Sequence, residues 1–488
     1  ISIGLVGSEM CIRDRNVLVN EGLNVEIIDV ISNISTKLKT RTFLVGGYVR
    51  DLLLGRKSKD IDVLVIGDGI SFASEVEKKL GSRANLQIFK NFGTAMIAYN
   101  DLEIEFVGSR KESYQKNSRN PVVSIGTFED DISRRDFTIN SIAISLNEDN
   151  KGEIIDLFDG IHDLKKGIIK TPKDPKITFY DDPLRMMRAV RFASQLNFEI
   201  KNSNIEIIKS EKERINIISK ERIHEELNKI LLSPKPSIGF ILLMKTGLLE
   251  IILPELIKLE GIDEIEGKTH KDNFYHTLQV VDNICKNTDN LWLRWVALLH
   301  DIGKPKTKRY NKKKGWSFHG HEYVGSKMVF KIFKRLKLPL NYKLDYVKKL
   351  VLLSSRPVIL SSSEITDSAI RRLIFDAGDD IDDLMTLCEA DITTKNVKLE
   401  KKYLNNFKFV REKIKDVEER DKIRNFQPPI SGKYIMDYFG IKPCKEIGLI
   451  KERIKEAILN GDINNDAIQA KELMMIVGER LGLKKYEK

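Results

Sequence analysis

Cysteine is scarce in this sequence, with four residues among 488. Cys11, Cys285, Cys388 and Cys444 lie far apart and form no C-x-x-C pair. This scarcity argues against a disulfide framework and against a zinc ribbon, because both need clustered cysteines. A reducing compartment suits such a chain, and we therefore expect a cytoplasmic protein.

Long hydrophobic runs are also missing. The longest apolar stretches, such as Gly239–Leu243 and Val351–Leu353, are far shorter than the roughly 18 residues of a membrane helix. We therefore expect no membrane association. The segment Ile1–Arg15 has neither an initiator Met nor the zones of a signal peptide. It resembles translated adapter sequence, and we expect residues 1–15 to be a non-native artefact.

Acidic residues are outnumbered, with 71 Asp and Glu against 82 Lys and Arg, a net charge of +11. Such a balance favours a polyanionic partner. A lysine-rich surface encoded by an AT-biased genome explains the charge equally well, so composition leaves both interpretations open. The length suits two to four domains. Motifs must therefore decide the function.

Strand and helix patterns alternate in the first third of the chain. Thr42–Val45 reads as a short strand, and Asp60–Ile66 begins with the polar and apolar alternation of another. Asn100-Asp101 separates two apolar runs and reads as a hairpin turn. We expect residues 25–165 to form a compact head that contains a mixed sheet.

Two glycines and two aspartates in this head point to nucleotide chemistry. Gly46 and Gly47 separate a predicted strand from a predicted helix, where backbone N–H groups approach a phosphate closely, and Arg50 follows. Asp60 and Asp62 are two apart on a strand and face the same side. Adjacent carboxylates repel unless a cation lies between them, and hard oxygen ligands suit Mg²⁺. We predict a Mg²⁺ site for nucleotidyl transfer.

A third carboxylate is expected on a neighbouring strand. In the segment LEIEFV, Glu103 and Glu105 share one face, opposite the apolar residues. Strand geometry does not separate the two; Glu105 is the preferred candidate for a catalytic carboxylate because its neighbours better resemble a known family pattern, and Glu103 is the alternative.

The first half of the chain contains, in order, GGYVRD at 46–51, DID at 60–62, DISRRDFTIN at 131–140, IIDLFDG at 154–160 and ERIHEEL at 221–227. These are among five or six motifs between residues 41 and 250 that resemble, in the same order, those of the class II tRNA nucleotidyltransferase and bacterial poly(A) polymerase family. The resemblance implies that Arg134, Arg135 and Asp136 engage the triphosphate and the sugar. Guanidinium groups suit this role because they fork onto phosphate oxygens.

The segment DDPLR falls where this family has Glu-Asp-x-x-Arg. Asp182 and Arg185 are three apart at a predicted helix start and share a face. The resemblance implies that Asp181, Asp182 and Arg185 contribute to nucleotide binding, and that the last two read the edge of the incoming base. The first position is Asp181 rather than Glu, which departs from the family pattern.

A second cluster of polar residues lies in the second half of the chain. His276, His300, Asp301 and Asp391 resemble the H…HD…D ligand pattern of the HD phosphohydrolase superfamily, and His321 is an added ligand or a phosphate contact. Imidazole and carboxylate groups from several helices can hold a divalent metal that activates water. The resemblance implies hydrolysis of small phosphoesters, including 2′,3′-cyclic phosphates. Persistence as an inactive packing domain is the alternative.

The predicted fold is α+β, with a nucleotidyltransferase-type mixed-sheet head followed by an all-helical neck, an HD-type body and a tail. Gly303 and Pro305 are predicted to end the helix that carries His300. The expected domains are a head at 25–165, an RNA-binding neck at 166–260, an HD domain at 270–395 and a helical tail at 396–488.

The predicted function is addition of CCA to tRNA 3′ ends from CTP and ATP, with Mg²⁺ in the head and a second divalent metal in the HD domain. One alternative is a poly(A) polymerase or an enzyme that adds only A or only CC. Another is an HD phosphohydrolase with an RNA-binding head. The segment Lys111–Ser124 is expected to contain part of a specificity loop. Lys306–Lys314 and the Lys-rich tail are candidate RNA contacts, with a solvated loop as the alternative for Lys312–Lys314.

Overall fold

The computed structural model describes residues 25–90, 93–113, 122–362, 366–394, 396–424 and 426–486. The chain divides into two compact units. The first runs up to Ile230 and includes Ile241–Ile251, and the second comprises Leu231–Phe240 and the chain from Ile252 onward. The segment expected to be non-native, 1–15, and the centre of the expected specificity loop, 114–121, lie outside the described residues.

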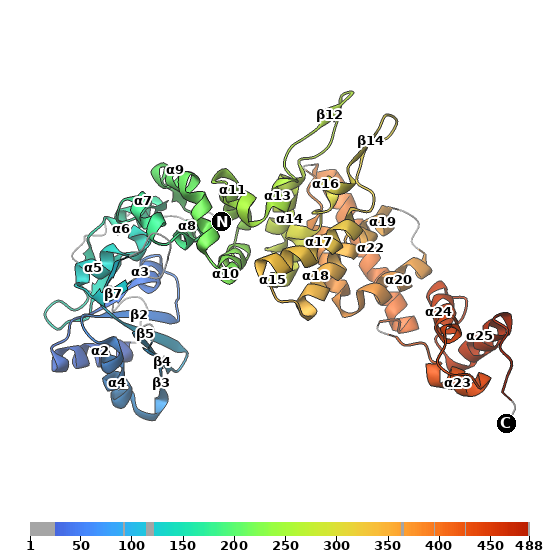
Figure 1. The fold of residues 1–488 in the computed structure, drawn as a ribbon, viewed down its shortest axis with the longest axis horizontal. Coiled ribbons are helices and arrows are strands. Elements are labelled where there is room, and N and C mark those ends of the chain that lie inside the picture. The colour runs from blue at the N-terminus through green and yellow to red at the C-terminus, as the bar shows by residue number, and fades with distance from the viewer. Residues whose placement is uncertain are drawn as a thin grey trace. The chain divides into compact units, whose positions relative to one another are not determined.

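The first part of the chain mixes strands and helices, as Figure 1 shows. Its elements are α2 (Val25–Leu38), β1 (Thr42–Val45), α3 (Gly46–Leu53), β2 (Asp60–Val65), α4 (Gly69–Leu80), β3 (Ala84–Phe89), β4 (Thr94–Tyr99), β5 (Leu102–Gly108), β6 (Arg110–Ser113), β7 (Val122–Ile125), α5 (Phe128–Ser133), β8 (Ile142–Ser145), β9 (Ile154–Asp156), α6 (Gly160–Lys166), β10 (Ile168–Ile169), α7 (Pro175–Asp181), α8 (Leu184–Leu196), β11 (Glu199–Ile200), α9 (Asn202–Glu211), α10 (Lys220–Leu231), α11 (Pro236–Lys245) and α12 (Leu248–Ile252).

Seven strands form the central sheet in the order β3-β4-β5-β2-β1-β8-β9. The pairing of β2 with β5 is parallel, whereas β1 pairs with β2 and β4 with β5 in antiparallel fashion. The predicted mixed-sheet head is thus confirmed. Asn100, in the turn between β4 and β5, has φ of 53°, a left-handed conformation that Asn tolerates at a hairpin turn.

Apolar alternation fixes which way the two central strands face. Ile61 and Val63 on β2, and Ile104 and Phe106 on β5, are buried. Because successive side chains of a strand point to opposite faces, the aspartates of β2 and the glutamates of β5 are held on the other side. Burial of these four apolar side chains, at roughly 1.5–3 kcal/mol each, stabilises the register that gathers the carboxylates.

The second part of the chain is predominantly helical. Its elements are α13 (Pro254–Ile257), β12 (Glu264–Ile265), β13 (Lys268–Thr269), α14 (Asn273–Ile284), α15 (Leu291–Leu299), α16 (Lys304–Thr307), β14 (Arg309–Asn311), β15 (Gly315–Ser317), α17 (His321–Leu336), α18 (Tyr342–Leu353), α19 (Arg356–Ser362), α20 (Asp367–Ala377), α21 (Ile381–Ala390), α22 (Val397–Asp421), α23 (Gly432–Phe439), α24 (Lys445–Asn460) and α25 (Ala467–Arg480).

The predicted helical body is confirmed, and two short ladders, β12 with β13 and β14 with β15, accompany its helices. The predicted all-helical neck is wrong in one detail, because β10 and β11 pair within residues 166–260. Pro305 does not end a helix. It lies in the first turn of α16, where its fixed φ and missing N–H are tolerated, while α15 already ends at Leu299. Within the described part of the chain, no helix is both long enough and apolar enough to span a membrane.

Candidate functional site

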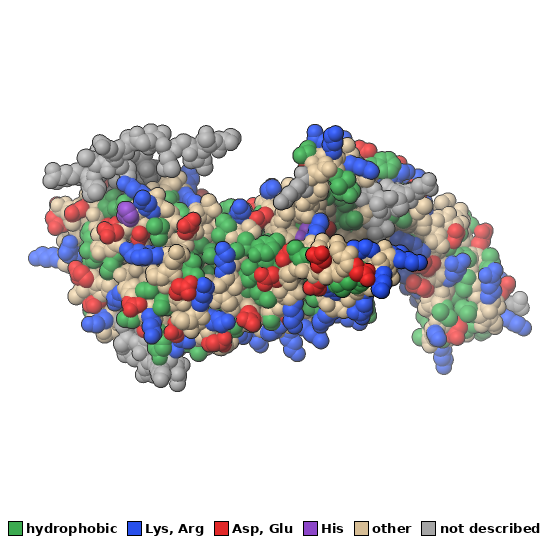
Figure 2. Space-filling view, turned by 90° about the horizontal axis from the view of Figure 1, so that it is seen from above, with side chains coloured by type: hydrophobic (Ala, Val, Ile, Leu, Met, Phe, Trp, Pro, Cys, Tyr) green, Lys and Arg blue, Asp and Glu red, His purple; other side chains and the backbone are tan. Residues whose placement is uncertain are grey.

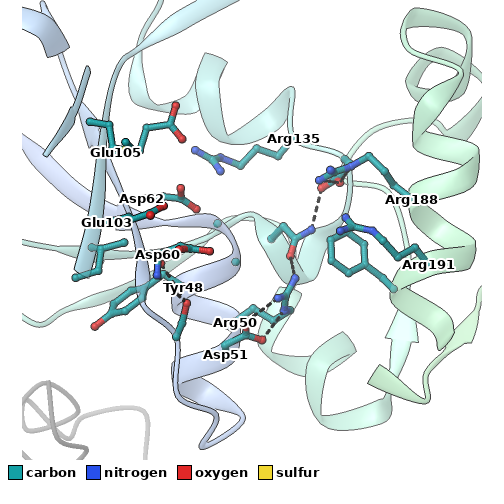
Figure 3. Close-up of a pocket in the computed structure, with 18 residues that line it drawn as sticks. Tyr48, Arg50, Asp51, Asp60, Asp62, Glu103, Glu105, Arg135, Arg188 and Arg191 are labelled. Atoms are coloured by element: carbon teal, nitrogen blue, oxygen red, sulfur yellow. Dashed lines mark hydrogen bonds and ion pairs between the residues drawn. The ribbon is translucent and has the colours of Figure 1, made fainter. Parts of the chain in front are cut away.

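Four carboxylates form two rungs across the parallel strands β2 and β5. Asp60 lies opposite Glu103, and Asp62 lies opposite Glu105. All four line one cavity of about 560 Å³ in the first unit, and Figure 3 shows them on the same side of it. The structure therefore brings together the predicted aspartate pair and both candidates for the third carboxylate. Such a set of oxygen ligands suits a hard divalent cation.

The paired glycines contribute backbone to the lining of this cavity. Gly46 and Gly47 follow β1 directly and open α3, and both line the cavity. Gly46 has a φ of 75°, which glycine adopts at no steric cost. The backbone N–H of Gly47 donates a hydrogen bond to the carboxylate of Asp62. The glycine turn thus holds one of the rung carboxylates in place.

The surroundings of Asp62 destabilise the ionised form of its carboxylate. Burial raises its pKa to about 6, and the neighbouring charges of Glu105 and Asp60 add to this effect, while Arg135 and the N–H of Gly47 oppose it. Concentrated negative charge of this kind is relieved by a proton or by a cation. The residues present therefore fit a divalent metal.

An arginine faces the carboxylates across the cavity. Arg135 lines the cavity and points toward the rungs (Figure 3). Its Nη2 donates to Oδ2 of the buried Asp131 at 3.1 Å. Arg134 uses the other oxygen of the same carboxylate, at 3.0 Å from Nε. Asp131 thus orients both predicted arginines, although Arg134 is outside the lining of the cavity.

Asp136 anchors a hydrogen-bonded chain along the wall of the cavity. Its Oδ2 accepts from Arg188 at 2.7 Å, and its Oδ1 accepts from Asn140 at 2.9 Å. Asn140 in turn accepts from Arg50 at 2.9 Å. Burial alone would raise the pKa of Asp136, but Arg188, Asn140 and Arg185 outweigh it and lower the pKa to about 2. Asp136 is therefore an anion at neutral pH, and it positions Arg188 directly and Arg50 through Asn140.

Three residues of α8 line the cavity without having been predicted. Arg188 and Arg191 flank the ring of Phe192, with their guanidinium carbons 5.4 and 4.2 Å from its centroid. Arg191 also forms an ion pair with Glu226 of α10 at 2.9 Å. The signal was present in the sequence, because an arginine recurs every third residue at 185, 188 and 191 in an otherwise apolar helix.

The proposed base-reading residues lie at the junction of α7 and α8. Asp181 ends α7, and Asp182 caps the following turn, where its Oδ1 accepts from the backbone N–H of Leu184 at 3.1 Å. Arg185 donates to the carbonyl of Arg134 at 2.7 Å. These three predicted residues are outside the lining of the carboxylate cavity. A carboxylate has two acceptor oxygens and a guanidinium has five N–H donors, so Asp182 and Arg185 can each form hydrogen bonds beyond these two.

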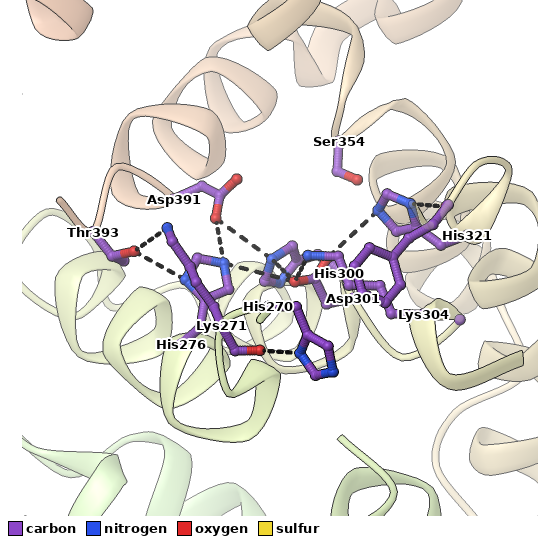
Figure 4. A network of polar contacts seen from close by, with 12 residues as sticks. His270, Lys271, His276, His300, Asp301, Lys304, His321, Ser354, Asp391 and Thr393 are labelled. Atoms are coloured by element: carbon purple, nitrogen blue, oxygen red, sulfur yellow. Dashed lines mark hydrogen bonds and ion pairs between the residues drawn. The ribbon is translucent and has the colours of Figure 1, made fainter. Parts of the chain in front are cut away.

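The second predicted cluster is assembled in the second unit (Figure 4). Nε2 of His276 lies 2.9 Å from Oδ1 of Asp391, and Nε2 of His300 lies 3.6 Å from the same oxygen. One ligand atom from each of these three residues lies within 4.8 Å of the others, so the three could hold one metal ion. Oδ2 of Asp301 is 3.3 Å from Nε2 of His300, and its Oδ1 is 3.4 Å from Nε2 of His321.

The outer nitrogens of these histidines are all engaged. Nδ1 of His276 contacts Thr393 Oγ1 at 3.0 Å, Nδ1 of His300 the carbonyl of Ala297 at 2.8 Å, and Nδ1 of His321 the carbonyl of Phe318 at 2.9 Å. This arrangement turns every Nε2 toward the aspartates. It is the pattern in which outer hydrogen bonds orient metal-binding imidazoles.

The inner atoms of the cluster lie at ion-pair distance from one another, but two of them lack hydrogen-bond geometry. His300 Nε2 and Asp391 Oδ1 are buried and have no partner of hydrogen-bond geometry among the described residues. Burial disfavours protonation of His300, yet Asp301 and Asp391 outweigh it and raise its pKa to about 10. Nζ of Lys304 forms an ion pair with Oδ2 of Asp301 at 2.5 Å and so partly compensates the negative charge of this carboxylate. Buried atoms of this kind fit a bound cation.

Comparisons with known proteins match three consecutive regions of the chain. Residues 42–170 match the poly(A) polymerase head domain, 197–259 the probable RNA- and SrmB-binding region of polymerase A, and 273–395 the HD domain. The chain is 32% identical over 319 residues to the multifunctional CCA protein of Mannheimia succiniciproducens, covering 62% of this chain and 71% of that protein. The chain belongs to the tRNA nucleotidyltransferase family.

Two further tRNA nucleotidyltransferases show how the similarity is distributed. The A-adding tRNA nucleotidyltransferase of Deinococcus radiodurans is 29% identical over 429 residues, 86% of this chain and 92% of that enzyme. The A-adding enzyme of Aquifex aeolicus is 40% identical over 169 residues, and the match spans 35% of this chain but only 20% of that protein.

Solved structures of tRNA nucleotidyltransferases share the fold. A CCA-adding enzyme with ATP superposes with a TM-score of 0.63 at 21% identity, covering 96% of this chain and 98% of that chain. The Thermotoga maritima CCA-adding enzyme complexed with tRNA gives a TM-score of 0.59, with the same identity and coverage.

Proposed function

We propose that this chain adds CMP, CMP and AMP to the 3′ end of tRNA, using CTP and ATP and releasing pyrophosphate. The observation that carries the proposal is the pair of carboxylate rungs, which face Arg135 across a cavity that two glycines also line. The names of two relatives, a multifunctional CCA protein and an A-adding tRNA nucleotidyltransferase, support tRNA, CTP and ATP as substrates. In this proposal the chain acts in the cytoplasm.

Asp60, Asp62 and Glu105 are proposed to hold Mg²⁺, and Glu103 is the alternative to Glu105. When bound, the metal would activate the attacking 3′ hydroxyl and stabilise the leaving pyrophosphate. Enzymes of this family use divalent metals, and the oxygen-only ligand set favours magnesium.

The remaining residues of the cavity are proposed to bind and orient the nucleotide. The N–H groups of Gly46 and Gly47, with the start of α3, would face phosphate oxygens. Arg135, and Arg50 held by Asn140, would place positive charge where the triphosphate lies. The buried anion of Asp136 would keep Arg188 fixed, so that guanidinium groups need no reorganisation during the reaction.

Asp182 and Arg185 are proposed to select the incoming base, and Asp181 lies next to Asp182 in the sequence. Arg185 is linked to Arg134 by the hydrogen bond that it donates to the backbone carbonyl of Arg134. A carboxylate that accepts and a guanidinium that donates can together match the edge of cytosine or adenine. The bond of Arg185 to the carbonyl of Arg134 connects this pair to the arginine motif of the cavity. Base choice and triphosphate binding are thereby proposed to be linked.

An extension assay tests this function. Purified protein with Mg²⁺ is given tRNA that lacks its last three, two or one nucleotides, together with CTP, ATP or both. The proposal expects three additions in the order C, C, A. Extension only of tRNA that already ends in CC would assign the chain to the A-adding enzymes, as the Deinococcus relative is named. No extension of any tRNA would refute nucleotidyl transfer.

A second function is proposed for the HD cluster, namely hydrolysis of a phosphoester. The unsatisfied inner atoms of His300 and Asp391 support it. His276, His300 and Asp391 would hold a divalent metal, with Asp301 next to it and His321 on the far side of Asp301. The metal would lower the pKa of a bound water. Hydrolysis of 2′,3′-cyclic AMP that survives Asp60→Asn but not His300→Ala is the expected result.

A further inference from the structure

Two small hairpins of the second unit are joined into one projecting element. β12–β13 and β14–β15 extend side by side from the helical body (Figure 1). Lys268 Nζ donates to the carbonyl of Lys312 at 2.5 Å, and Trp316 Nε1 donates to the carbonyl of Lys268 at 3.0 Å. Tyr310 adds a hydrogen bond to the carbonyl of Ile265 at 3.2 Å. The element composed of residues 263–269 and 308–317 is called the hairpin pair below.

Aromatic packing gives the hairpin pair a fixed shape. The ring of Trp316 meets Tyr310 and His270 edge to face, with centroid separations of 5.2 and 5.3 Å. Lys308 lies over the same indole, 4.8 Å from its centroid, and forms an ion pair with Asp263. A solvated loop would need none of these contacts. The hairpin pair is therefore a built surface that holds its outer residues in defined positions.

Both hairpins lead directly into the His/Asp cluster. After β13 comes Lys271, whose Nζ lies 3.5 Å from Oγ1 of Thr393, the hydroxyl that contacts His276. After β15 comes Phe318, whose carbonyl contacts Nδ1 of His321 at 2.9 Å. Figure 4 shows Lys271 and His321 on opposite sides of the cluster. A ligand that lies along the hairpin pair would therefore reach the cluster at its end.

The charge of the hairpin pair favours an anionic ligand. Lys and Arg side chains, in blue, are also visible on the face of the second part of the chain that Figure 2 shows. It carries six Lys or Arg residues against three carboxylates. Lys308 is neutralised by Asp263, and Lys312 lies 3.9 Å from Glu266. Arg309, Lys313 and Lys314 are exposed, and within the described ranges no carboxylate lies in ion-pair distance of them. Arg309 at the start of β14, together with Lys313 and Lys314 in the turn that follows this strand, is thus available to phosphates.

We propose that the hairpin pair is a docking surface for the sugar-phosphate backbone of an RNA strand whose 3′ end reaches the His/Asp cluster. A single strand offers phosphates at regular intervals, which suits separated cations on a firm support. Lys271 and Lys304 would then meet the terminal phosphate. The inference rests on the proposed action of this chain on RNA, which the extension assay tests separately.

The test uses the full chain and a short single-stranded RNA with a 3′ phosphate and a fluorescent 5′ label. Arg309→Ala/Lys313→Ala/Lys314→Ala removes the three free cations. Lys327→Ala/Lys331→Ala/Lys334→Ala, at exposed positions of α17, removes the same charge elsewhere in the second unit. Fluorescence anisotropy gives the affinity of each protein at several salt concentrations.

The hairpin variant is expected to bind at least 10-fold more weakly at low salt. Its slope of log affinity against log salt should be less steep by about 2, because each phosphate contact of a single strand contributes roughly 0.7. An equal loss in both variants, or a loss in neither, would overturn the proposal. Lys313→Ala/Lys314→Ala, confined to the turn, serves as a second variant and should show about two thirds of the change in slope.

An RNA with a photocrosslinking base at its 3′ end tests independently which end of the strand reaches the His/Asp cluster. It is expected to attach to residues 271–276 or 304–321, whereas a 5′-terminal base should not. The opposite pattern would overturn the proposal. tRNA extension by the hairpin variant is measured in parallel, because the carboxylate cavity lies in the other unit and its chemistry should be retained. A wild-type protein that binds this RNA but extends no tRNA would count against nucleotidyl transfer alone.

Discussion

The carboxylate of Asp62 lies so close to Gly46 that a Cβ atom on this glycine would be 2.6 Å from Oδ2 of Asp62. Gly46→Ala is therefore expected to displace Asp62 from its rung and to lower the rate of tRNA extension at least 10-fold. Gly55→Ala is the matched control, because Gly55 also has a positive φ but no atom within 4 Å of its added Cβ. Both variants should lose about 1–3 kcal/mol through backbone strain. Equal extension rates would contradict the role of the contact.

Removing either rung aspartate should abolish extension without unfolding the chain. Asp60→Asn and Asp62→Asn each keep the shape of the side chain but remove a charge that the proposed metal needs. The expected loss in kcat is at least about 100-fold, the scale of losing one preorganised electrostatic group. Asp101→Asn, in the exposed turn between β4 and β5, is the control. Steady-state extension and thermal melting provide the measurements, and a variant with wild-type kcat would refute the metal site.

The two glutamates of β5 should differ in importance. Glu105 lies opposite Asp62, and its charge helps to raise the pKa of Asp62, whereas Glu103 lies opposite Asp60 at the exposed start of β2. Glu105→Gln is therefore expected to reduce kcat by at least 10-fold more than Glu103→Gln. The reverse order would transfer the third-carboxylate role to Glu103.

The ion pair between Asp136 and Arg188 makes stability depend on acid. The pKa of Asp136 is about 2 in the folded chain and about 3.9 when unfolded. Its contribution is therefore complete above about pH 4 and is lost as the pH falls through 2. Because Arg188 is partly exposed, we expect up to about 2 kcal/mol. The melting temperatures of the wild type and Asp136→Asn should converge as the pH is lowered from 5 to 3; a constant gap would contradict this account.

Divalent metal should stabilise the second unit through the His/Asp cluster. A metal that binds only the folded chain adds about 2.7 kcal/mol when present at 100 times its Kd. His276→Ala should therefore lose the rise in melting temperature that Mn²⁺ or Ni²⁺ gives the wild type, and tRNA extension should be retained. His319→Ala is the control, because His319 is exposed and close in sequence to the cluster. Loss of the shift in both variants would argue against the site.

Local periodicity accounts for what the sequence predicted well. The alternation in DID and in LEIEFV is enough to place Asp60 with Asp62 and Glu103 with Glu105, because the side-chain period of a strand is fixed. The parallel register that aligns these pairs is a long-range property. It follows from burial of Ile61 and Ile104 against the core, which no short segment reveals.

Other features escaped prediction for a different physical reason. Arg188 and Arg191 lie in a largely buried helix, so their pattern resembled packing rather than a cavity wall. The strands β12 to β15 are only two or three residues long, and their stability comes from contacts between hairpins rather than from propensity. Lys312–Lys314 was expected to be either an RNA contact or a solvated loop, and the contacts made by Lys268 and Trp316 were not visible in the sequence.

The register between β2 and β5 also limits which insertions and deletions the gene can tolerate. A one-residue shift of either strand would turn its carboxylates into the apolar core and its core residues into the cavity. An inserted codon in the turn at Asn100 and Asp101 would have to be absorbed within that turn, or it would disable catalysis and folding together. We therefore expect homologous genes to vary the length of this turn far less than that of the segment between β6 and β7.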